Sequence, residues 1–357
     1  MKDLLLISTG GTISQELEED EGTGTAAGTK GAYTFSTQLN VIAQELRINI
    51  VPMAILNKDS SNIIPDDWRV MIDTIAQEYE NYDAFLLTHG TNTLGYTCAA
   101  LSFALGKLGK PVIVTGSQVP YGSPGSDAVL NLENTIRVAA HSGPLVGVVA
   151  VFGSHIITGA RVQKTTEFEY EAFKTFSLKN SLGRIGQALR WDRPALERHN
   201  KFMEPRARSE AELDIKPQFE MDRIISLTDF PGLKSEFFNV LVDGGAKGII
   251  YRATGAGDPN VASVDSDFDN LREGFEYLRD KKIPIVITTQ APDGVASMDV
   301  NDPGKHAFEL GAIPAWDMSM EAMTVKLGWL LGRKFPYEEM RTLMLESFRG
   351  EIDPGRS

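Results

Sequence analysis

Threonine hydroxyls follow two short apolar runs of this sequence. Leu4–Ser14 (LLLISTGGTIS) carries Thr12 and Leu86–Leu94 (LLTHGTNTL) carries Thr91, each in a tight turn that contains glycine. Short apolar runs predict strands, and the ligands of an open parallel sheet bind outside the carboxyl ends of its strands. We therefore expect Thr12 and Thr91 to face one pocket and to present their hydroxyls to a substrate.

A threonine hydroxyl is a poor nucleophile at neutral pH and needs a neighbouring base or a positioned amine. Lys164, in Thr158–Thr166 (TGARVQKTT), follows the β-rich run Val146–Phe152 and could reach the same edge of the sheet. A lysine that is desolvated beside a hydroxyl could lose its proton and act as the base. The alternative interpretation, a solvated surface charge, is the commoner one for any single lysine.

Other polar groups near these turns have structural interpretations as well. Asp59–Asn62 (DSSN) could bind a carboxylate, although capping of the following helix would also explain it. The serine, aspartate and asparagines of residues 126–134 are expected to be structural hydrogen-bonding groups. His89 could shape its turn, and the sequence offers it no carboxylate partner for a Ser-His-Asp arrangement.

The composition disfavours several classes of function. The net charge of −13 disfavours nucleic acids and anionic membranes as partners, because both need a basic face. Cys98 is the single cysteine, so it cannot form an intrachain disulfide or a CxxC metal site, and its apolar surroundings predict a buried packing residue. The sequence contains no GxSxG elbow, P-loop, HExxH or EF-hand spacing, and TGGT is not a dinucleotide-binding fingerprint.

Neither a membrane span nor a signal peptide is expected. No segment approaches the roughly 18 apolar residues of a transmembrane helix. Leu4–Ile7 is too short for the apolar core of a signal peptide and is followed at once by a glycine turn. We therefore expect a cytoplasmic protein.

The elements that must position these residues alternate along the chain. This alternation predicts βαβ units and a parallel sheet, hence an α/β fold. Strands are expected at 83–88, 111–115, 146–152, 224–227, 248–251 and 283–289. Helices are expected from Ser36 and at 66–79, 95–106, 128–140, 235–242, 271–281 and 320–331.

A chain of 357 residues is expected to form about two domains. Residues 191–219 are charged, contain three prolines and show no clear period, which is typical of a linker. We predict an N-terminal catalytic domain at 1–195, with a larger, mostly parallel sheet flanked by helices. A linker at 196–221 and a smaller C-terminal α/β domain at 222–357 follow it.

The segment Glu16–Lys30 is acidic and then rich in Gly, Thr and Ala, with no apolar periodicity. Such a segment buries too little apolar surface to order itself. It follows the Thr12 turn, so we expect either a mobile flap over the first strand end or a plain surface loop.

Three segments resemble the signature motifs of the bacterial-type L-asparaginase/glutaminase family, in order and in spacing. They are Thr9–Ile13 (TGGTI), Thr88–Thr93 (THGTNT) and Gly159–Lys164 (GARVQK). The resemblance covers essentially the whole chain, and Asp317–Leu327 is similar to the cytoplasmic, type I branch. The chain also resembles the asparaginase-like subunit of the Glu-tRNA(Gln) amidotransferase, without that subunit's N-terminal extension.

The resemblance implies roles for particular residues. Thr12 matches the nucleophile that forms an acyl-enzyme, and Tyr33 matches the tyrosine that assists it. Thr91 and Lys164 match the second threonine and its lysine, which polarise the hydroxyl or a water. The positions that match the substrate-binding residues are Gly11, Ser60, Ser61 and Asn92, the two serines being those that hold the substrate α-carboxylate.

Some positions depart from the family pattern. Asn92 stands where the family has an aspartate that holds the substrate α-ammonium beside the lysine. An amide at this position can still accept a hydrogen bond but removes the attraction between charges. Asp258 stands where the family often has asparagine. The family's late acidic residue has three candidates here, Asp299, Asn301 and Asp302, of which Asn301 is the closest match.

The leading functional prediction is hydrolysis of L-asparagine to L-aspartate and ammonia. The resemblance implies no metal or organic cofactor, and it implies a homodimer or homotetramer acting on a small-molecule amide. Asn92 keeps two alternatives open: an asparagine- or aspartate-binding regulatory protein, or an amidase for substrates that lack a free α-amine. A nucleotide-binding α/β protein is disfavoured because the phosphate-binding motifs are absent.

Overall fold

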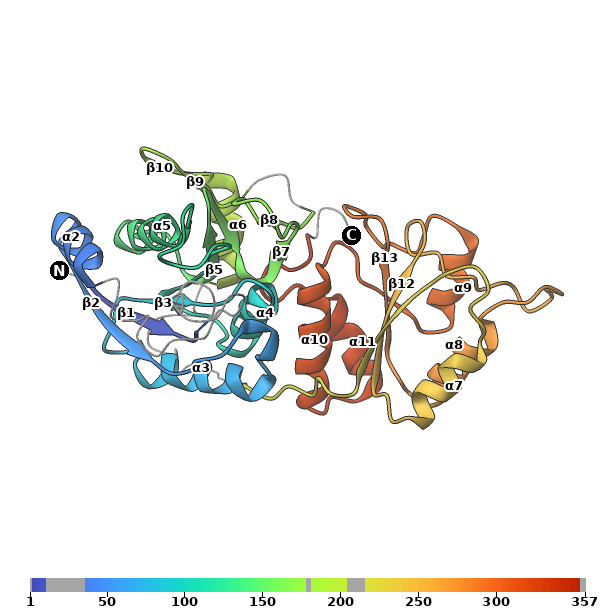
Figure 1. Cartoon of the computed structure of the whole chain (residues 1–357). Coiled ribbons are helices and arrows are strands. Elements are labelled where there is room, and N and C mark those ends of the chain that lie inside the picture. Colours follow the sequence, from blue (N-terminus) through green and yellow to red (C-terminus); the bar gives the residue numbers. More distant parts are fainter. Residues whose placement is uncertain (1, 11–35, 178–180, 204–215, 354–357) are drawn as a thin grey trace, which may run out of the picture. The chain divides into compact units, whose positions relative to one another are not determined.

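The computed structural model describes residues 2–10, 36–177, 181–203 and 216–353 (Figure 1). The chain divides into two compact units, Met1–Pro217 and Gln218–Ser357. Each unit has its own sheet and its own hydrophobic core.

An eight-stranded sheet forms the centre of the first unit in the described residues, in the order β10-β9-β6-β5-β4-β3-β1-β2. Its parallel strands are β1 (Lys2–Ser8), β2 (Ile48–Ala54), β3 (Ala84–Thr88), β4 (Pro111–Thr115) and β5 (Gly147–Phe152). The antiparallel strands are β6 (His155–Thr158), β9 (Gly183–Ile185) and β10 (Leu189–Trp191). The short strands β7 (Val162–Lys164) and β8 (Phe173–Thr175) form a separate antiparallel pair.

Helices cover both faces of this sheet. The helices α2 (Ser36–Leu46) and α5 (Ala128–Ala140) pack on the face that carries Leu4, Leu6 and Leu86. The helices α3 (Pro65–Gln77) and α4 (Leu94–Ala104) lie on the other side in Figure 1. Strands covered on both faces are apolar without interruption, which explains why β3, β4 and β5 could be predicted from sequence.

The strand order reverses at β1, which lies between β2 and β3. Connections that leave such a point on opposite faces create a crevice at the carboxyl ends of the strands. Ser8 pairs with Thr88 in the parallel register, and Thr9 N and Thr9 Oγ1 both donate to Thr88 O, at 3.2 and 2.8 Å. The strands that lead to the two threonine turns therefore end side by side, as the sequence predicted.

The second unit contains a four-stranded parallel sheet in the described residues, in the order β11-β12-β13-β14. Its strands are β11 (Ile224–Thr228), β12 (Gly248–Ala253), β13 (Ile285–Thr289) and β14 (Ile313–Pro314). Its helices are α7 (Glu236–Asp243), α8 (Arg272–Asp280), α9 (Asp302–Glu309), α10 (Met320–Gly332) and α11 (Tyr337–Leu345). The predicted fold class is thereby confirmed: a larger, mostly parallel sheet with helices and a smaller α/β unit.

One part of the predicted linker is wrong. The helix α6 (Arg193–Met203) occupies residues expected to lie at the end of the first domain and in the linker. Its buried face consists of Ala195, Leu196, His199 and Met203. The apolar period was hidden because a histidine fills one of its positions, where it bonds to Val146 O at 2.8 Å.

No helix among the described residues is long and apolar enough to cross a membrane.

Candidate active site

The turn after β3 contains the first group of candidate residues. β3 ends at Thr88 and α4 begins at Leu94, so residues 89–93 form the turn. A Cβ atom built on Gly90 would lie 2.6 Å from Ser60 Oγ, which is far too close. Gly90 therefore allows the turn to pack directly against Ser60.

His89 fixes this turn from the inside. Its Nδ1 lies 2.6 Å from Gly90 O, and its Nε2 lies 2.9 Å from Thr97 Oγ1, which accepts from Trp68 Nε1 at 3.0 Å. Burial lowers the pKa of His89 to about 4, so the imidazole is neutral at physiological pH. Nδ1 then donates to Gly90 O and Nε2 accepts from Thr97, which is the turn-shaping role expected for His89.

Ser60 and Ser61 lie against the same turn. Asn92 N donates to Ser60 Oγ at 3.1 Å, and Asn92 Nδ2 donates to Ser61 Oγ at 2.8 Å. Thr93 Oγ1 donates to Ser60 O at 2.6 Å. Asp59 is a helix cap, but of the short helix Ser60–Asn62, where its carboxylate accepts from Ser61 N at 2.7 Å, and not of α3, whose N-cap is Ile64.

Lys164 reaches Thr91 from a distant part of the chain. It is the last residue of β7, paired with Phe173 of β8, and its Nζ lies 2.9 Å from Thr91 Oγ1 and 3.3 Å from Asn92 Oδ1. Only 12% of the Lys164 side chain and 7% of Thr91 are exposed. The structure thus brings together Thr91, Lys164, Asn92 and both serines.

This arrangement can polarise a hydroxyl. As an ammonium, Lys164 donates to Thr91 Oγ1 and leaves the hydroxyl proton for another acceptor. As a neutral amine, Lys164 can accept that proton across the same 2.9 Å contact. In both protonation states the Thr91 hydroxyl is prepared for proton transfer or for hydrogen bonding to a substrate.

Sequence reasoning missed Glu167, whose Oε2 lies 2.6 Å from Lys164 Nζ. Its side chain is 77% exposed and belongs to the loop between β7 and β8. An acidic residue three positions after the lysine was the only available signal, and such spacing is common on protein surfaces.

Thr12, Tyr33, Gly11 and the segment Glu16–Lys30 lie outside the described residues. The glycine that precedes them, Gly10, has a φ of +96°, and a Cβ there would lie 2.5 Å from Lys58 N. Backbone in this left-handed region, with no room for a side chain, requires glycine at the first position of the turn.

The polar residues of the segment 126–134 are structural, as predicted. Asp127 accepts from the N–H groups of Gln118 and Val119, both at 3.0 Å. Asn131 donates to Gly116 O and accepts from Gly153 N, both at 2.9 Å, and so links the ends of β4 and β5. Cys98 is also a buried packing residue, as expected.

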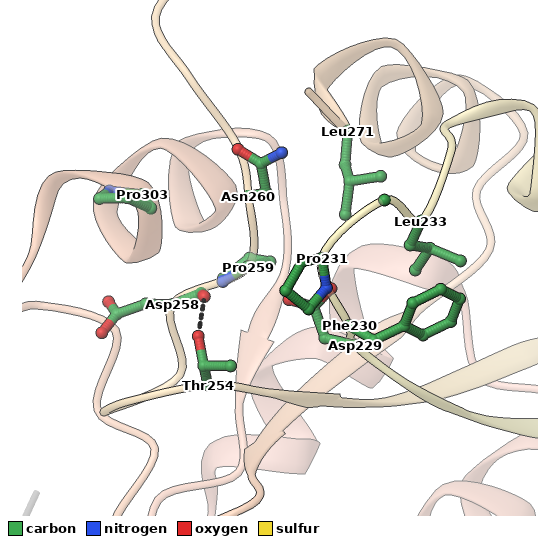
Figure 2. A pocket seen from close by; sticks show the side chains of 11 residues that line it. Asp229, Phe230, Pro231, Leu233, Thr254, Asp258, Pro259, Asn260, Leu271 and Pro303 are labelled. Atoms are coloured by element: carbon green, nitrogen blue, oxygen red, sulfur yellow. Dashed lines mark hydrogen bonds between the residues drawn. The ribbon is translucent and has the colours of Figure 1, made fainter. Parts of the chain in front are cut away.

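In the second unit, a cavity of about 400 Å³ lies beyond the carboxyl ends of β11 and β12. Figure 2 shows a largely apolar lining, from which the Asp258 carboxylate points away. The residues that line it include Phe230, Pro231, Leu233, Pro259, Leu271 and Pro303.

Asp258 instead pairs with Asn301. Asn301 Nδ2 donates to Asp258 Oδ2 at 2.7 Å, and Ala256 N donates to the same oxygen at 3.2 Å. Of the three late candidates, Asn301 is thus the one in contact with Asp258. Asp299 instead accepts from Ser297, and Asp302 lies 3.5 Å from Lys305 Nζ.

In the described ranges, no three His, Cys, Asp or Glu side chains gather in a group that could hold a metal ion.

Comparison of the sequence with known proteins identifies the family of this chain. Residues 3–197 match the model of the asparaginase N-terminal domain, and residues 223–344 match that of the glutaminase/asparaginase C-terminal domain. An L-asparaginase of Thermococcus kodakarensis is 33% identical over 353 residues, which cover 98% of each chain. A subunit of the glutamyl-tRNA(Gln) amidotransferase of Pyrococcus abyssi is 30% identical over 99% of this chain and 77% of its own length.

The three-dimensional structure agrees with the sequence. The crystal structure of L-asparaginase I from Vibrio cholerae superposes with a TM-score of 0.81 at 27% identity, covering 99% of each chain. The two matched domain models together span both compact units. The chain belongs to the asparaginase family.

Proposed function

We propose that this protein hydrolyses the side-chain amide of L-asparagine to L-aspartate and ammonia. The observation that carries the proposal is the 2.9 Å contact between Lys164 Nζ and Thr91 Oγ1 at the carboxyl end of β3. A mostly buried amine aimed at a threonine hydroxyl, in a member of a family with relatives named L-asparaginase, is suited to amide hydrolysis.

The reaction proceeds in two steps through a threonine ester. The Thr12 hydroxyl, assisted by Tyr33, adds to the amide carbon, and ammonia leaves with the proton that it needs. A water polarised by Thr91 and Lys164 then adds to the ester, and the proton returns to Thr12 as aspartate is released. Backbone N–H groups of the glycine turns, Gly11 among them, stabilise the oxyanion of both steps.

The substrate α-carboxylate is held by Ser60 and Ser61. Both hydroxyls lie against the turn that carries Thr91, which makes a substrate bound there a neighbour of the Thr91–Lys164 pair. The two hydroxyls can turn to donate to a carboxylate, because each has one proton and two lone pairs.

A second candidate is an amidase for substrates that lack a free α-amine. The observation that favours it is Asn92, a neutral amide whose Oδ1 lies 3.3 Å from Lys164 Nζ and whose Nδ2 donates to Ser61. Such an amide leaves no charge with which to hold an α-ammonium.

The test is ammonia release from L-asparagine, L-glutamine, succinamic acid and a peptide-linked asparagine. We expect the highest kcat/KM with L-asparagine. A clear preference for succinamic acid, which has the amide and the carboxylate but no amine, would select the second candidate. No release from any of the four would favour a binding protein without turnover.

We also propose that the chain acts as a homo-oligomer in the cytoplasm. Closed symmetric assemblies are the commonest form of soluble oligomers, and the family resemblance favours a dimer or tetramer. Light scattering should give a mass of at least two chains, and a fully active monomer would contradict this.

A further inference from the structure

The ammonium of Lys164 has three partners among the described residues. They are Thr91 Oγ1 at 2.9 Å, Asn92 Oδ1 at 3.3 Å and Glu167 Oε2 at 2.6 Å. An ammonium has three N–H donors, so each partner takes one of them. Glu167 forms the shortest of the three contacts, and it alone among them can carry a negative charge.

We propose that Glu167 is a positioning residue for the reaction, holding the Lys164 ammonium against the Thr91 hydroxyl. This inference rests on the proposed function. It assigns to an exposed acid of the β7–β8 loop an effect on turnover that operates through Lys164 and without contact to the substrate.

The loop that carries Glu167 is anchored on both sides. Thr165 N donates to Ala172 O at 2.9 Å and closes the loop at its base. Gln118 Nε2 lies within hydrogen-bond distance of Thr166 O and Glu169 O, at 3.4 and 3.3 Å. Tyr170 Oη donates to Gly125 O at 2.7 Å. The backbone on either side of Glu167 is therefore tied to the segment 118–125, which restricts where its carboxylate can lie.

The charges explain why a carboxylate is needed at this place. The Lys164 side chain is mostly buried, so its ammonium has lost much of its hydration. Thr91 and Asn92 are neutral acceptors, so among the three partners only the Glu167 carboxylate adds an attraction between opposite charges to its hydrogen bond. Because the lysine stem is long and flexible, removal of the carboxylate lets the ammonium turn away from Thr91 towards water.

A second acid in the same loop provides a matched control. Glu169 is exposed like Glu167 and lies two residues further on, but in the described structure its carboxylate makes no contact with Lys164. Glu171 is unsuitable as a control, because it accepts from Ser154 N at 3.1 Å.

The experiment measures kcat and KM of the parent, Glu167→Gln, Glu167→Asp and Glu169→Gln with L-asparagine and with succinamic acid. We expect Glu167→Gln to lower kcat about ten-fold with both substrates and to change KM less than about two-fold. Glu167→Asp should retain more activity than Glu167→Gln, and Glu169→Gln should match the parent.

A rescue variant tests whether the effect passes through the lysine. Asn92→Asp in the Glu167→Gln background places a new carboxylate at a position whose side-chain oxygen already lies 3.3 Å from Lys164 Nζ. We expect it to restore most of the lost kcat with succinamic acid. That substrate has no amine for an aspartate at position 92 to bind, so any gain in kcat must come from the contact of this aspartate with Lys164.

The outcomes separate this inference from the proposed function. A parent without turnover overturns both. An active parent whose Glu167→Gln variant is equally active overturns the inference and leaves the proposed function intact. A loss confined to L-asparagine, or a change in KM alone, shows that Glu167 binds the substrate ammonium and overturns its role on Lys164. If succinamic acid is not turned over, the kinetic constants with L-asparagine decide between these roles: a loss of kcat supports the role of Glu167 on Lys164, and a change in KM alone contradicts it.

Discussion

At the scale of single residues, the position of Thr91 depends on neighbours that take no part in chemistry. His89 ties the turn to Thr97, and Gly90 allows Ser60 to lie against it. The backbone N–H of Asn92 donates to Ser60 Oγ. Thr91 therefore presents its hydroxyl from a turn with little freedom to relax, which is what a preorganised site requires.

Gly90→Ala tests this dependence. The added Cβ would lie 2.6 Å from Ser60 Oγ and 2.8 Å from Ser60 Cβ, so either the turn or the segment 59–62 must move. We expect a loss of about 1–3 kcal/mol in the free energy of unfolding, measured by urea denaturation, and a larger proportional loss of kcat/KM. Gly143→Ala is the control, because a Cβ there meets nothing within 4 Å. Parent-like activity in Gly90→Ala would mean that the turn is adaptable.

The candidate residues could be predicted only in part from the sequence. The contact between Thr91 and Lys164 followed from two recognisable motifs at strand ends, although 72 residues lie between them in the chain. Glu167 could not be found, because whether an exposed acid meets a lysine depends on a loop that is held by Gln118 and Tyr170. Likewise, the contact between Asp258 and Asn301 depends on how the loop after β12 meets the start of α9.

At the scale of elements, the strands of the first sheet that are buried on both faces were predictable, whereas β2, β6, β9 and β10 of the same sheet were not. β2 is at the edge of its sheet and contains Pro52, which lowers the strand propensity but is tolerated where no partner strand needs its N–H group. The strands β6, β9 and β10 have three or four residues each, too few to show a period. These elements are specified by their neighbours in the sheet more than by their own residues.

A buried ion pair joins α10 to the chain that follows α11. Lys326 Nζ lies 2.8 Å from Glu351 Oε1, and both side chains are fully buried. Lys326 also donates to Met344 O at 3.0 Å and to Glu346 O, while Glu351 accepts from Phe348 N at 3.1 Å and Arg349 N at 2.7 Å. Removal of one partner leaves the other charge buried without compensation.

Glu351→Gln should therefore lower the free energy of unfolding by about 3–5 kcal/mol, measured by urea denaturation at neutral pH. The control is Asp66→Asn, which removes a pair with Arg69 whose side chains are 49% and 73% exposed, and which should cost less than about 1 kcal/mol. Similar losses in the two variants would mean that the buried pair contributes no more than a surface pair.

The same ion pair makes the free energy of unfolding depend on pH in the acid range. Burial by itself would raise the pKa of Glu351, but the Lys326 ammonium and two backbone N–H donors outweigh this and hold it below its usual value. A carboxyl with a lower pKa in the folded chain contributes fully above its unfolded pKa of about 4.3, and this contribution is lost as the pH falls towards the folded pKa. We expect the parent to lose more stability than Glu351→Gln between pH 6 and acid pH (roughly 3), and equal losses would contradict the assignment.

At the scale of the whole molecule, each unit has a sheet with parallel strands and helices, but the carboxyl ends of the strands lead to different features in the two units. In the first unit, the carboxyl ends of β1 and β3 lead to the threonine turns, and Lys164 arrives from β7. In the second, the ends of β11 and β12 border an apolar cavity, and the nearby Asp258 points elsewhere. The Thr91–Lys164 pair that supports amide hydrolysis therefore belongs to the first unit.

The central claim is that Lys164 and Thr91 act together in the hydrolysis of L-asparagine. The measurement that tests it most directly is the rate at which the intact chain releases ammonia and aspartate from L-asparagine, for the parent, Lys164→Met and the control Lys174→Met. Lys174 lies on the neighbouring strand β8, exposed to solvent and paired in register with Gln163. We predict equal amounts of the two products from the parent, a loss of at least about 100-fold in kcat for Lys164→Met, and no loss for Lys174→Met. A Lys164→Met variant within a few-fold of the parent would contradict the account.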